Sequence, residues 1–108
     1  MEQNDLIIFL FPDTKIFIGG SVGPYGACQA DGSEYDGKYM QYLTEKDIID
    51  WHRPRINALI ESGVDFIALE TFPAASEALY VIKLLKEYPS TKFWITFSCK
   101  VRFDNLSI

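Results

Sequence analysis

Three short apolar runs, separated by two longer segments with helical features, constrain the fold of this chain more than any other feature. Lys15 to Gly19, Val64 to Leu69 and Phe93 to Phe97 are rich in β-branched and aromatic residues, which favour β-strands. The second run is almost entirely apolar, as expected of a strand that is covered on both faces. Strands that alternate with helices indicate a parallel α/β sheet.

The segment after the first predicted strand is rich in glycine. Gly19 to Lys38 contains six of the seven glycines, which predicts a loop of roughly 20 residues, and loops of that length are usually functional or disordered. Gly20 to Gly26 has the spacing G-x-x-G-x-x-G, which differs from the dinucleotide-binding pattern. Two interpretations remain open: a sharp turn with positive φ angles, or a backbone that approaches a ligand closely.

Two helices are predicted between the strands. Thr44, followed by acidic residues, is suited to be the N-cap of a helix that runs to about Ser62, with Gly63 after its end. Pro54 lies in its middle and predicts a kink or a division into two shorter helices. The second helix is expected to begin with Pro73 in its first turn. Its apolar positions at helical spacing are Leu79, Ile82 and Leu85.

Glu70 and Thr71 directly follow the second predicted strand. The carboxyl ends of parallel strands form the usual substrate-binding edge of α/β folds, so we expect Glu70 at that edge. A carboxylate there is suited to bind a substrate ammonium group. Two structural roles are equally compatible with this position: an ion pair with an arginine, or an acceptor at the start of the helix that begins near Pro73.

The residues that could bind a metal or act as nucleophiles are few. His52 is the only histidine, and its place within a predicted helix favours a packing or capping role. Cys28 and Cys99 are far apart, which indicates neither a disulfide framework nor a zinc knuckle. Cys99 follows the third strand, on the same edge as Ser21 and Glu70, but has no base nearby in sequence. We therefore expect no metal site and a reducing, cytoplasmic setting.

Charge and hydropathy exclude several kinds of partner. The net charge is −5 and no basic stripe is present, which argues against binding to nucleic acids or anionic membranes. The longest apolar run, Leu6 to Phe11, is far shorter than the roughly 20 residues that cross a bilayer as a helix. The acidic start of the chain also lacks the positive region of a secretory signal.

Five segments of the chain together resemble the homocysteine S-methyltransferase family. They follow the family's order and spacing from about Ile16 to Lys100. The segments are Gly19 to Gly26, Asp31 to Tyr35, His52 to Arg55, Asp65 to Thr71 and Trp94 to Cys99. The resemblance implies a zinc-dependent (β/α)8 barrel, also called a TIM barrel. It also implies methyl transfer from S-methylmethionine or S-adenosylmethionine to homocysteine, giving methionine.

The same resemblance implies which residues form the site. In the family, a glutamate at the position of Glu70 contacts the amino group of homocysteine, and we expect Gly20, Ser21, Thr71 and Cys99 to be the other substrate-binding residues. The zinc of the complete enzyme is held by three cysteines in G-x-N-C and G-G-C-C motifs, and neither motif occurs in this sequence. We therefore expect no catalytic residue, no metal ligand and no bound cofactor in this chain alone.

The chain is expected to form only part of such a barrel. A complete barrel needs about 250 residues, whereas residues 1–108 supply about three βα units, roughly barrel strands three to five. The first hypothesis is a partial homocysteine-binding domain, with a matching core at about 16–100, whose activity belongs to the complete barrel. The second is a truncated, non-catalytic isoform that acts as a binding or interaction chain. The third is an unrelated small α/β binding domain. Open sheet edges predict self-association.

Overall fold

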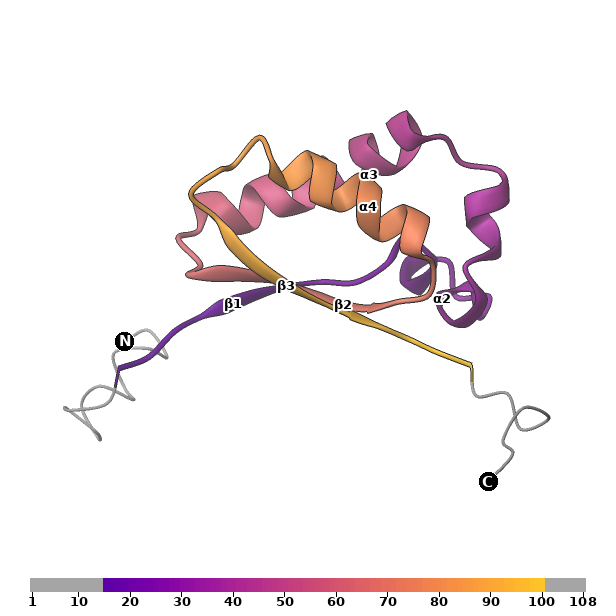
Figure 1. The fold of residues 1–108 in the computed structure, drawn as a ribbon, viewed down its shortest axis with the longest axis horizontal. Helices are drawn as coiled ribbons and strands as arrows, with labels where there is room; N and C mark the ends of the chain where they lie inside the picture. Colours follow the sequence, from indigo (N-terminus) through magenta and orange to yellow (C-terminus); the bar gives the residue numbers. More distant parts are fainter. Residues whose placement is uncertain (1–14, 101–108) are drawn as a thin grey trace, which may run out of the picture.

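The computed structural model describes residues 15–100, which form one parallel sheet with helices packed on one side (Figure 1). The elements in chain order are β1 (Gly19–Val22), the 3-10 helix η1 (Tyr25–Cys28), α2 (Ser33–Asp36), the 3-10 helix η2 (Lys38–Gln41), α3 (Glu45–Glu61), β2 (Phe66–Phe72), α4 (Ala75–Leu85) and β3 (Lys92–Phe97). Figure 1 shows α3 and α4 on the same side of the sheet.

The sheet has the order β1-β2-β3, and both strand pairs are parallel. Gly19 is paired with Phe66, and Phe66 with Lys92. The predicted alternation of strands and helices around a parallel sheet is therefore confirmed. The third strand is within one residue of its predicted bounds. The described residues form an open sheet of three strands rather than a closed barrel.

The prediction for the first strand was wrong in its bounds. β1 begins at Gly19, where the predicted strand ended, because its pairing with β2 begins there. Asp65 holds the chain just before β1: the Ile18 amide donates to Asp65 Oδ2 at 2.7 Å, and the Asp65 amide donates to the Ile18 carbonyl at 2.7 Å. The apolar run does lead into a strand, but the residue at which β1 begins is determined by its pairing with β2.

The glycine-rich segment is more ordered than a long loop. It contains the end of β1 and the short helices η1, α2 and η2. Of the two interpretations of Gly20 to Gly26, the turn with positive φ angles is wrong, because the glycines with positive φ are Gly32, Gly37 and Gly63. Gly26 is required for close packing instead. A Cβ atom there would lie 2.5 Å from the ring of Tyr39 and 2.8 Å from the Glu34 amide nitrogen.

Helix α3 has the predicted ends and is one helix rather than two shorter ones. Thr44 is its N-cap and forms a capping box with Asp47, in which each side chain accepts from the other's backbone amide. Gly63, with φ of 86°, follows its C-cap as predicted. Pro54 lies inside one continuous helix of 17 residues. Pro54 has no N–H to donate to the Asp50 carbonyl, and Asp50 is an exposed residue of the helix.

The hydrophobic core lies between the sheet and the two long helices. α4 begins at Ala75 with Ala74 as its N-cap, so Pro73 precedes the helix and does not open it. Of the apolar positions at helical spacing in this helix, Leu85 is buried, whereas Leu79 is 64% exposed. The core cluster consists of Val22, Tyr39, Ile48, Ile56, Ile67, Leu69, Phe72, Ala78, Val81, Leu84 and Leu85.

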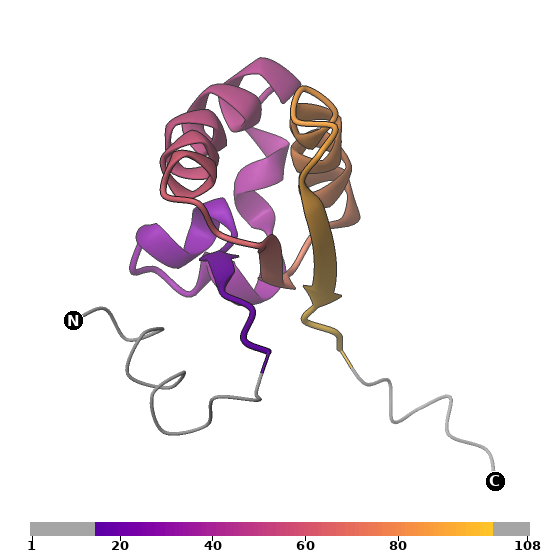
Figure 2. The same ribbon diagram turned by 90° about the vertical axis from the view of Figure 1, so that its left-hand side faces the viewer.

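The two faces of the sheet differ sharply. Residues alternate along each strand, and partners in parallel strands share a face, so two sets of side chains separate. Those that face the helices are Val22, Ile67, Leu69, Phe93 and Ile95. Those on the opposite face are Ser21, Phe66, Ala68, Glu70, Trp94 and Thr96. Within residues 15–100 no helix covers the second set, which we call the open face (Figure 2).

In the part of the chain that the structure describes, no helix has the length and apolar character needed to cross a membrane. The apolar run Leu6 to Phe11, considered above, lies outside the described residues.

Candidate functional site

Glu70 and Thr71 lie in an irregular part of β2, close to its carboxyl end. The register with β3 shifts between Leu69 and Phe72, and Thr71 has φ of 63°. A β-branched residue is rarely found in the left-handed region, and such a conformation costs on the order of 1–3 kcal/mol. Bulges and strained residues of this kind are enriched at functional sites. The strand continues to Phe72, so Glu70 is within β2 rather than just beyond it.

The Glu70 carboxylate lies on the open face and is held by neighbours on β3. The Trp94 indole N–H donates to Oε1 at 2.8 Å, and the Thr96 hydroxyl donates to Oε2 at 3.0 Å. The Thr71 amide in turn donates to Thr96 Oγ1 at 2.8 Å. Each carboxylate oxygen therefore has one neutral donor from the protein and retains a lone pair for a further donor.

Neither structural role considered for Glu70 is the one observed. Among the ion pairs of residues 15–100, none includes Glu70, so an arginine partner is not found there. The N-cap of α4 is Ala74 and receives no side-chain cap. Glu70 is thus a half-buried carboxylate that is oriented by neutral donors and has no ion-pair partner among residues 15–100.

The other predicted substrate-binding residues are brought together only in part. Ser21 lies on the open face of β1, paired with Ala68, and its face is shared by Glu70. Gly20 lies on the opposite face, where a Cβ atom would be 3.1 Å from a methyl carbon of Leu59. Cys99 follows the end of β3 and is an exposed free thiol. Of the predicted set, Ser21 and Glu70 therefore share the open face, and Thr71 follows Glu70 in β2.

A buried polar network on the helix side was missed by the sequence analysis. Glu77, in the first turn of α4, and His52, in α3, are both fully buried, and His52 Nε2 is 2.9 Å from Glu77 Oε2. The Tyr25 amide donates to the same oxygen at 2.8 Å, and the Tyr39 hydroxyl donates to Oε1. His52 also packs between the rings of Trp51 and Phe72. The predicted packing role of His52 is confirmed.

Tyr39 keeps its proton in this network. Its burial, together with the hydrogen bond to Glu77 and the negative charge of that carboxylate, raises the pKa of the Tyr39 hydroxyl well above its ordinary value. The hydroxyl is therefore a donor to Glu77 over the whole physiological pH range. This fixes the direction of the hydrogen bond between η2 and α4.

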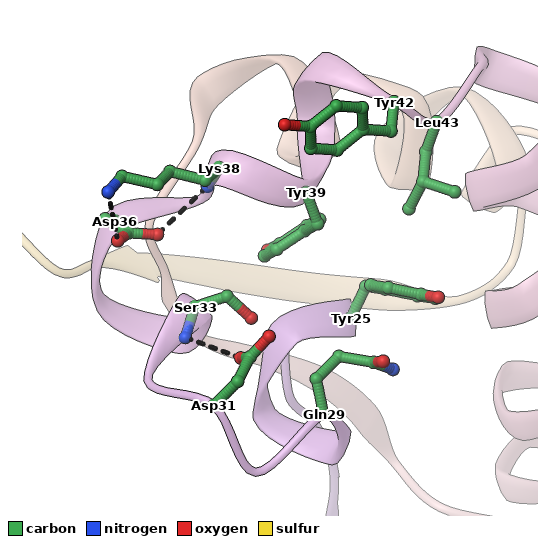
Figure 3. Close-up of a pocket in the computed structure, with 9 residues that line it drawn as sticks. All are labelled: Tyr25, Gln29, Asp31, Ser33, Asp36, Lys38, Tyr39, Tyr42 and Leu43. Carbon is green, nitrogen blue, oxygen red and sulfur yellow. Dashed lines mark hydrogen bonds and ion pairs between the residues drawn. The ribbon is translucent and has the colours of Figure 1, made fainter.

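A shallow cavity of about 380 Å³ lies among the short helices after β1 (Figure 3). Two of its acidic residues serve local turns: Asp31 accepts from the Ser33 amide at 2.9 Å, and Asp36 accepts from the Lys38 amide at 3.0 Å. Hydrogen bonds from Ser33 hold the pKa of Asp31 below its usual value. The cavity does not include Glu70.

The described residues do not fit a zinc site. Within residues 15–100 there is no group of three or more histidine, cysteine or acidic side chains that could hold a metal ion. A structural or catalytic zinc needs at least three such protein ligands in close proximity. Cys28 and Cys99 are both free and exposed.

Comparison with known proteins gives consistent matches along the chain. The sequence model of the family described as homocysteine S-methyltransferase matches residues 5–107. A homocysteine S-methyltransferase of Bacillus subtilis is 52% identical over 86 residues, which are 80% of this chain and 27% of that protein. A betaine-homocysteine S-methyltransferase of Drosophila melanogaster is 45% identical over 83 residues, which are 76% of this chain and 25% of that protein.

The fold comparison agrees with the sequence comparison. The crystal structure of the Escherichia coli homocysteine methyltransferase in its metallated form superposes with a TM-score of 0.85 and 38% identity. The match covers 90% of this chain and 33% of that one. The chain thus spans about a quarter to a third of the length of the relatives that it matches.

Proposed function

Because this chain belongs to the homocysteine S-methyltransferase family, we propose that it supplies the amino-group-binding wall of a site that methylates homocysteine. The observation that carries the proposal is the geometry of Glu70 at the bulged end of β2. We further propose that β1, β2 and β3 correspond to about strands three to five of a (β/α)8 barrel. The barrel mouth would then lie at the carboxyl ends of these strands.

The surroundings of Glu70 suit a substrate ammonium group. The two neutral donors, Trp94 and Thr96, fix the carboxylate plane, and no protein cation competes for its charge among the described ion pairs. An ammonium donates up to three hydrogen bonds and would complete the coordination of both oxygens. Ser21, on the neighbouring strand and the same face, could contact the rest of the amino acid.

The proposed reaction joins the sulfur of homocysteine to a methyl group from a donor such as S-methylmethionine or S-adenosylmethionine. The bond between the methyl carbon and the donor sulfur breaks as the new carbon–sulfur bond forms. The donor leaves as a neutral thioether, homocysteine becomes methionine, and the thiol proton passes to solvent. By resemblance the complete enzyme uses zinc, but residues 15–100 hold no ligand set for it, so their part is limited to binding and orientation.

The role of Glu70 can be tested in a chimera, in which residues 15–100 replace the matching third of the E. coli homocysteine methyltransferase. Glu70→Gln keeps the shape and removes the charge. Homocysteine affinity should fall about tenfold to more than a hundredfold, because a hydrogen bond to a charged group contributes roughly 1.5–3 kcal/mol. Isothermal titration with homocysteine measures the change.

A matched control is Glu87→Gln, which makes the same chemical change at an exposed carboxylate paired with Arg53. It should leave homocysteine affinity unaltered. Unchanged affinity in Glu70→Gln, together with a sharp fall in melting temperature, would show that Glu70 has a structural role and refute the proposal.

A second candidate function is that of a non-catalytic interaction chain, which the exposed aromatic residues favour. Trp94 is 52% exposed on the open face, and Phe17 and Phe97 are also exposed. An uncovered sheet of this kind tends to pair with another sheet. The isolated chain should therefore elute as an oligomer whose size depends on concentration, and Trp94→Ser should weaken the association. A monomer that unfolds cooperatively over a wide concentration range would contradict this.

A further inference from the structure

We propose that Glu77 is a positioning residue that fixes the β1–α3 segment (residues 23–44) against the end of β2, where Glu70 and Thr71 lie. Its consequence for substrate binding rests on the proposed function, whereas its geometric part rests on contacts within the described residues. Glu77 is remote from the open face and would touch neither substrate nor donor.

One carboxylate anchors three separate elements. Glu77 Oε1 accepts from the hydroxyl of Tyr39 in η2, and Oε2 accepts from the amide of Tyr25, the first in η1. His52 Nε2, in α3, lies 2.9 Å from the same Oε2. These partners are 52, 38 and 25 residues away along the chain. Hydrogen bonds over such separations define how whole elements are placed, rather than the shape of one turn.

Of the three short helices, η1 depends most directly on this anchor, because the first amides of α2 and η2 donate to the nearby side chains of Asp31 and Asp36. The N-cap positions of η1, α2 and η2 are Pro24, Gly32 and Gly37, and none of them provides a side-chain hydrogen bond. The free amide at the start of η1 is satisfied by Glu77 instead. Helices of four residues are not stable alone. We therefore attribute the position of η1 to its bond with Glu77, and that of η2 to the bond and packing of Tyr39.

The anchor is connected to the candidate site by direct contacts. The ring of His52 stacks on Phe72, with centroids 6.0 Å apart and an angle of 23° between planes. Phe72 is fully buried, directly follows the strained Thr71, and its carbonyl accepts from the Ser98 amide at 3.0 Å. The segment also touches the chain just after β2, since a Cβ atom at Gly37 would lie 3.2 Å from that of Ala74.

The experiment compares wild-type chain with Glu77→Gln and, as a matched control, the exposed Glu87→Gln. Glutamine has a single acceptor oxygen, so it cannot accept from all the present donors, and its amide group would face one of them. Amide hydrogen exchange is read by NMR at Tyr25 within the segment, and at Leu69 and Val81 in the core. The two indole N–H signals report on the segment, through Trp51 beside Tyr25, and on the site, through Trp94 bonded to Glu70.

In Glu77→Gln, the Tyr25 amide should exchange roughly tenfold to a hundredfold faster, as expected from the loss of a hydrogen bond to a charged group. The core amides should change much less, and both indole signals should shift. Glu87→Gln should behave as wild type. Equal acceleration at Tyr25, Leu69 and Val81 would overturn the proposal, because it would show a purely global effect on stability. An unchanged Tyr25 rate would also overturn it.

Two further arms keep the result decisive. If Glu77→Gln does not fold, Tyr39→Phe is used instead, because it removes one partner of Glu77. Amide exchange should then accelerate less, and only within residues 23–44. Faster exchange at the core amides as well would refute the positioning role. Homocysteine is then titrated into the chimera described above, with and without Glu77→Gln, while the Trp94 indole signal is followed. No response in wild type counts against the proposed function alone, because the exchange pattern still decides the role of Glu77. Suppose that homocysteine shifts the Trp94 indole signal equally in wild type and in Glu77→Gln, although residues 23–44 exchange faster in the variant. Glu77 would then have no effect on the candidate site, and that part of the proposal would be wrong.

Discussion

The two faces of the sheet are built from alternate residues of the same three strands, yet one is buried and apolar and the other is partly exposed and hydrogen-bonded. On the helix side, Leu69 and Ile67 are fully buried in a continuous apolar core. On the open face, Glu70, Trp94 and Thr96 are connected by hydrogen bonds and remain accessible in part. The first face is explained by hydrophobic burial, which stabilises this chain. On the open face, the hydrogen bonds that hold Glu70 are not required for burial of the core.

The largest effect that tests this contrast is a loss of stability on the helix side. Leu69→Ala should lower the free energy of unfolding by about 2–5 kcal/mol, because it leaves a cavity at a fully buried position. Trp94→Ala on the open face removes a larger side chain but should cost only about 1 kcal/mol, since half of it is already in water. Urea denaturation of both variants measures the difference. Similar losses would mean that the two faces do not differ in this way.

A second effect concerns the proton of Tyr39, on the covered side. Its pKa is raised in the folded chain, so the unfolded chain releases this proton first as pH rises. Stability from this group is complete below pH about 10 and falls above it, by up to about 1.4 kcal/mol for each pH unit, until the folded form also ionises. Denaturation at pH 9 to 11 should show the decline.

Tyr39→Phe should remove that part of the alkaline decline. Tyr42→Phe is the control, because Tyr42 is 81% exposed and is not bonded to Glu77. If the two variants behave alike between pH 9 and 11, the buried network does not hold the proton of Tyr39.

The smallest effect concerns the strained residue beside the open face. Thr71→Gly should leave the free energy of unfolding unchanged or raise it by up to about 1 kcal/mol, because glycine adopts a φ of 63° without strain. Ser21→Gly, at a strand position of the open face with ordinary φ, should instead lose roughly 0.5–1 kcal/mol. Thermal unfolding of the pair gives the sign. A loss in Thr71→Gly as large as that in Ser21→Gly would show that the Thr71 conformation carries no strain.

Features encoded by neighbouring residues could be predicted from the sequence. The N-cap at Thr44 and the end of its helix at Gly63 depend on side chains and backbone within a few residues, and both were placed correctly. β3 is a compact run of β-branched and aromatic residues, and its bounds were nearly correct. The position of Glu70 near the carboxyl end of a strand also followed from the local pattern.

Features that depend on distant partners were missed. The start of β1 is determined by its pairing with Phe66, and the glycine at position 26 is required by the ring of Tyr39. The network around Glu77 joins four elements, so no local pattern contains it. A signal did exist: His52 lies on the helical stripe of Ile48 and Ile56, and Glu77 on that of Val81 and Leu84. Two polar residues that lie within apolar stripes of facing helices indicate a buried pair.

The order of strands in the sheet has a consequence for how the chain acquires its structure during synthesis. Because spatial order equals chain order, each new strand docks on the one made just before it, and most contacts can form as residues emerge. The segment between β1 and α3 is the exception. Its amide at Tyr25 must wait for residue 77, so more than fifty residues are translated before this early segment finds its final partner. We expect this segment to become resistant to proteases only after α4 has been made, although it precedes α3 and β2 in the chain.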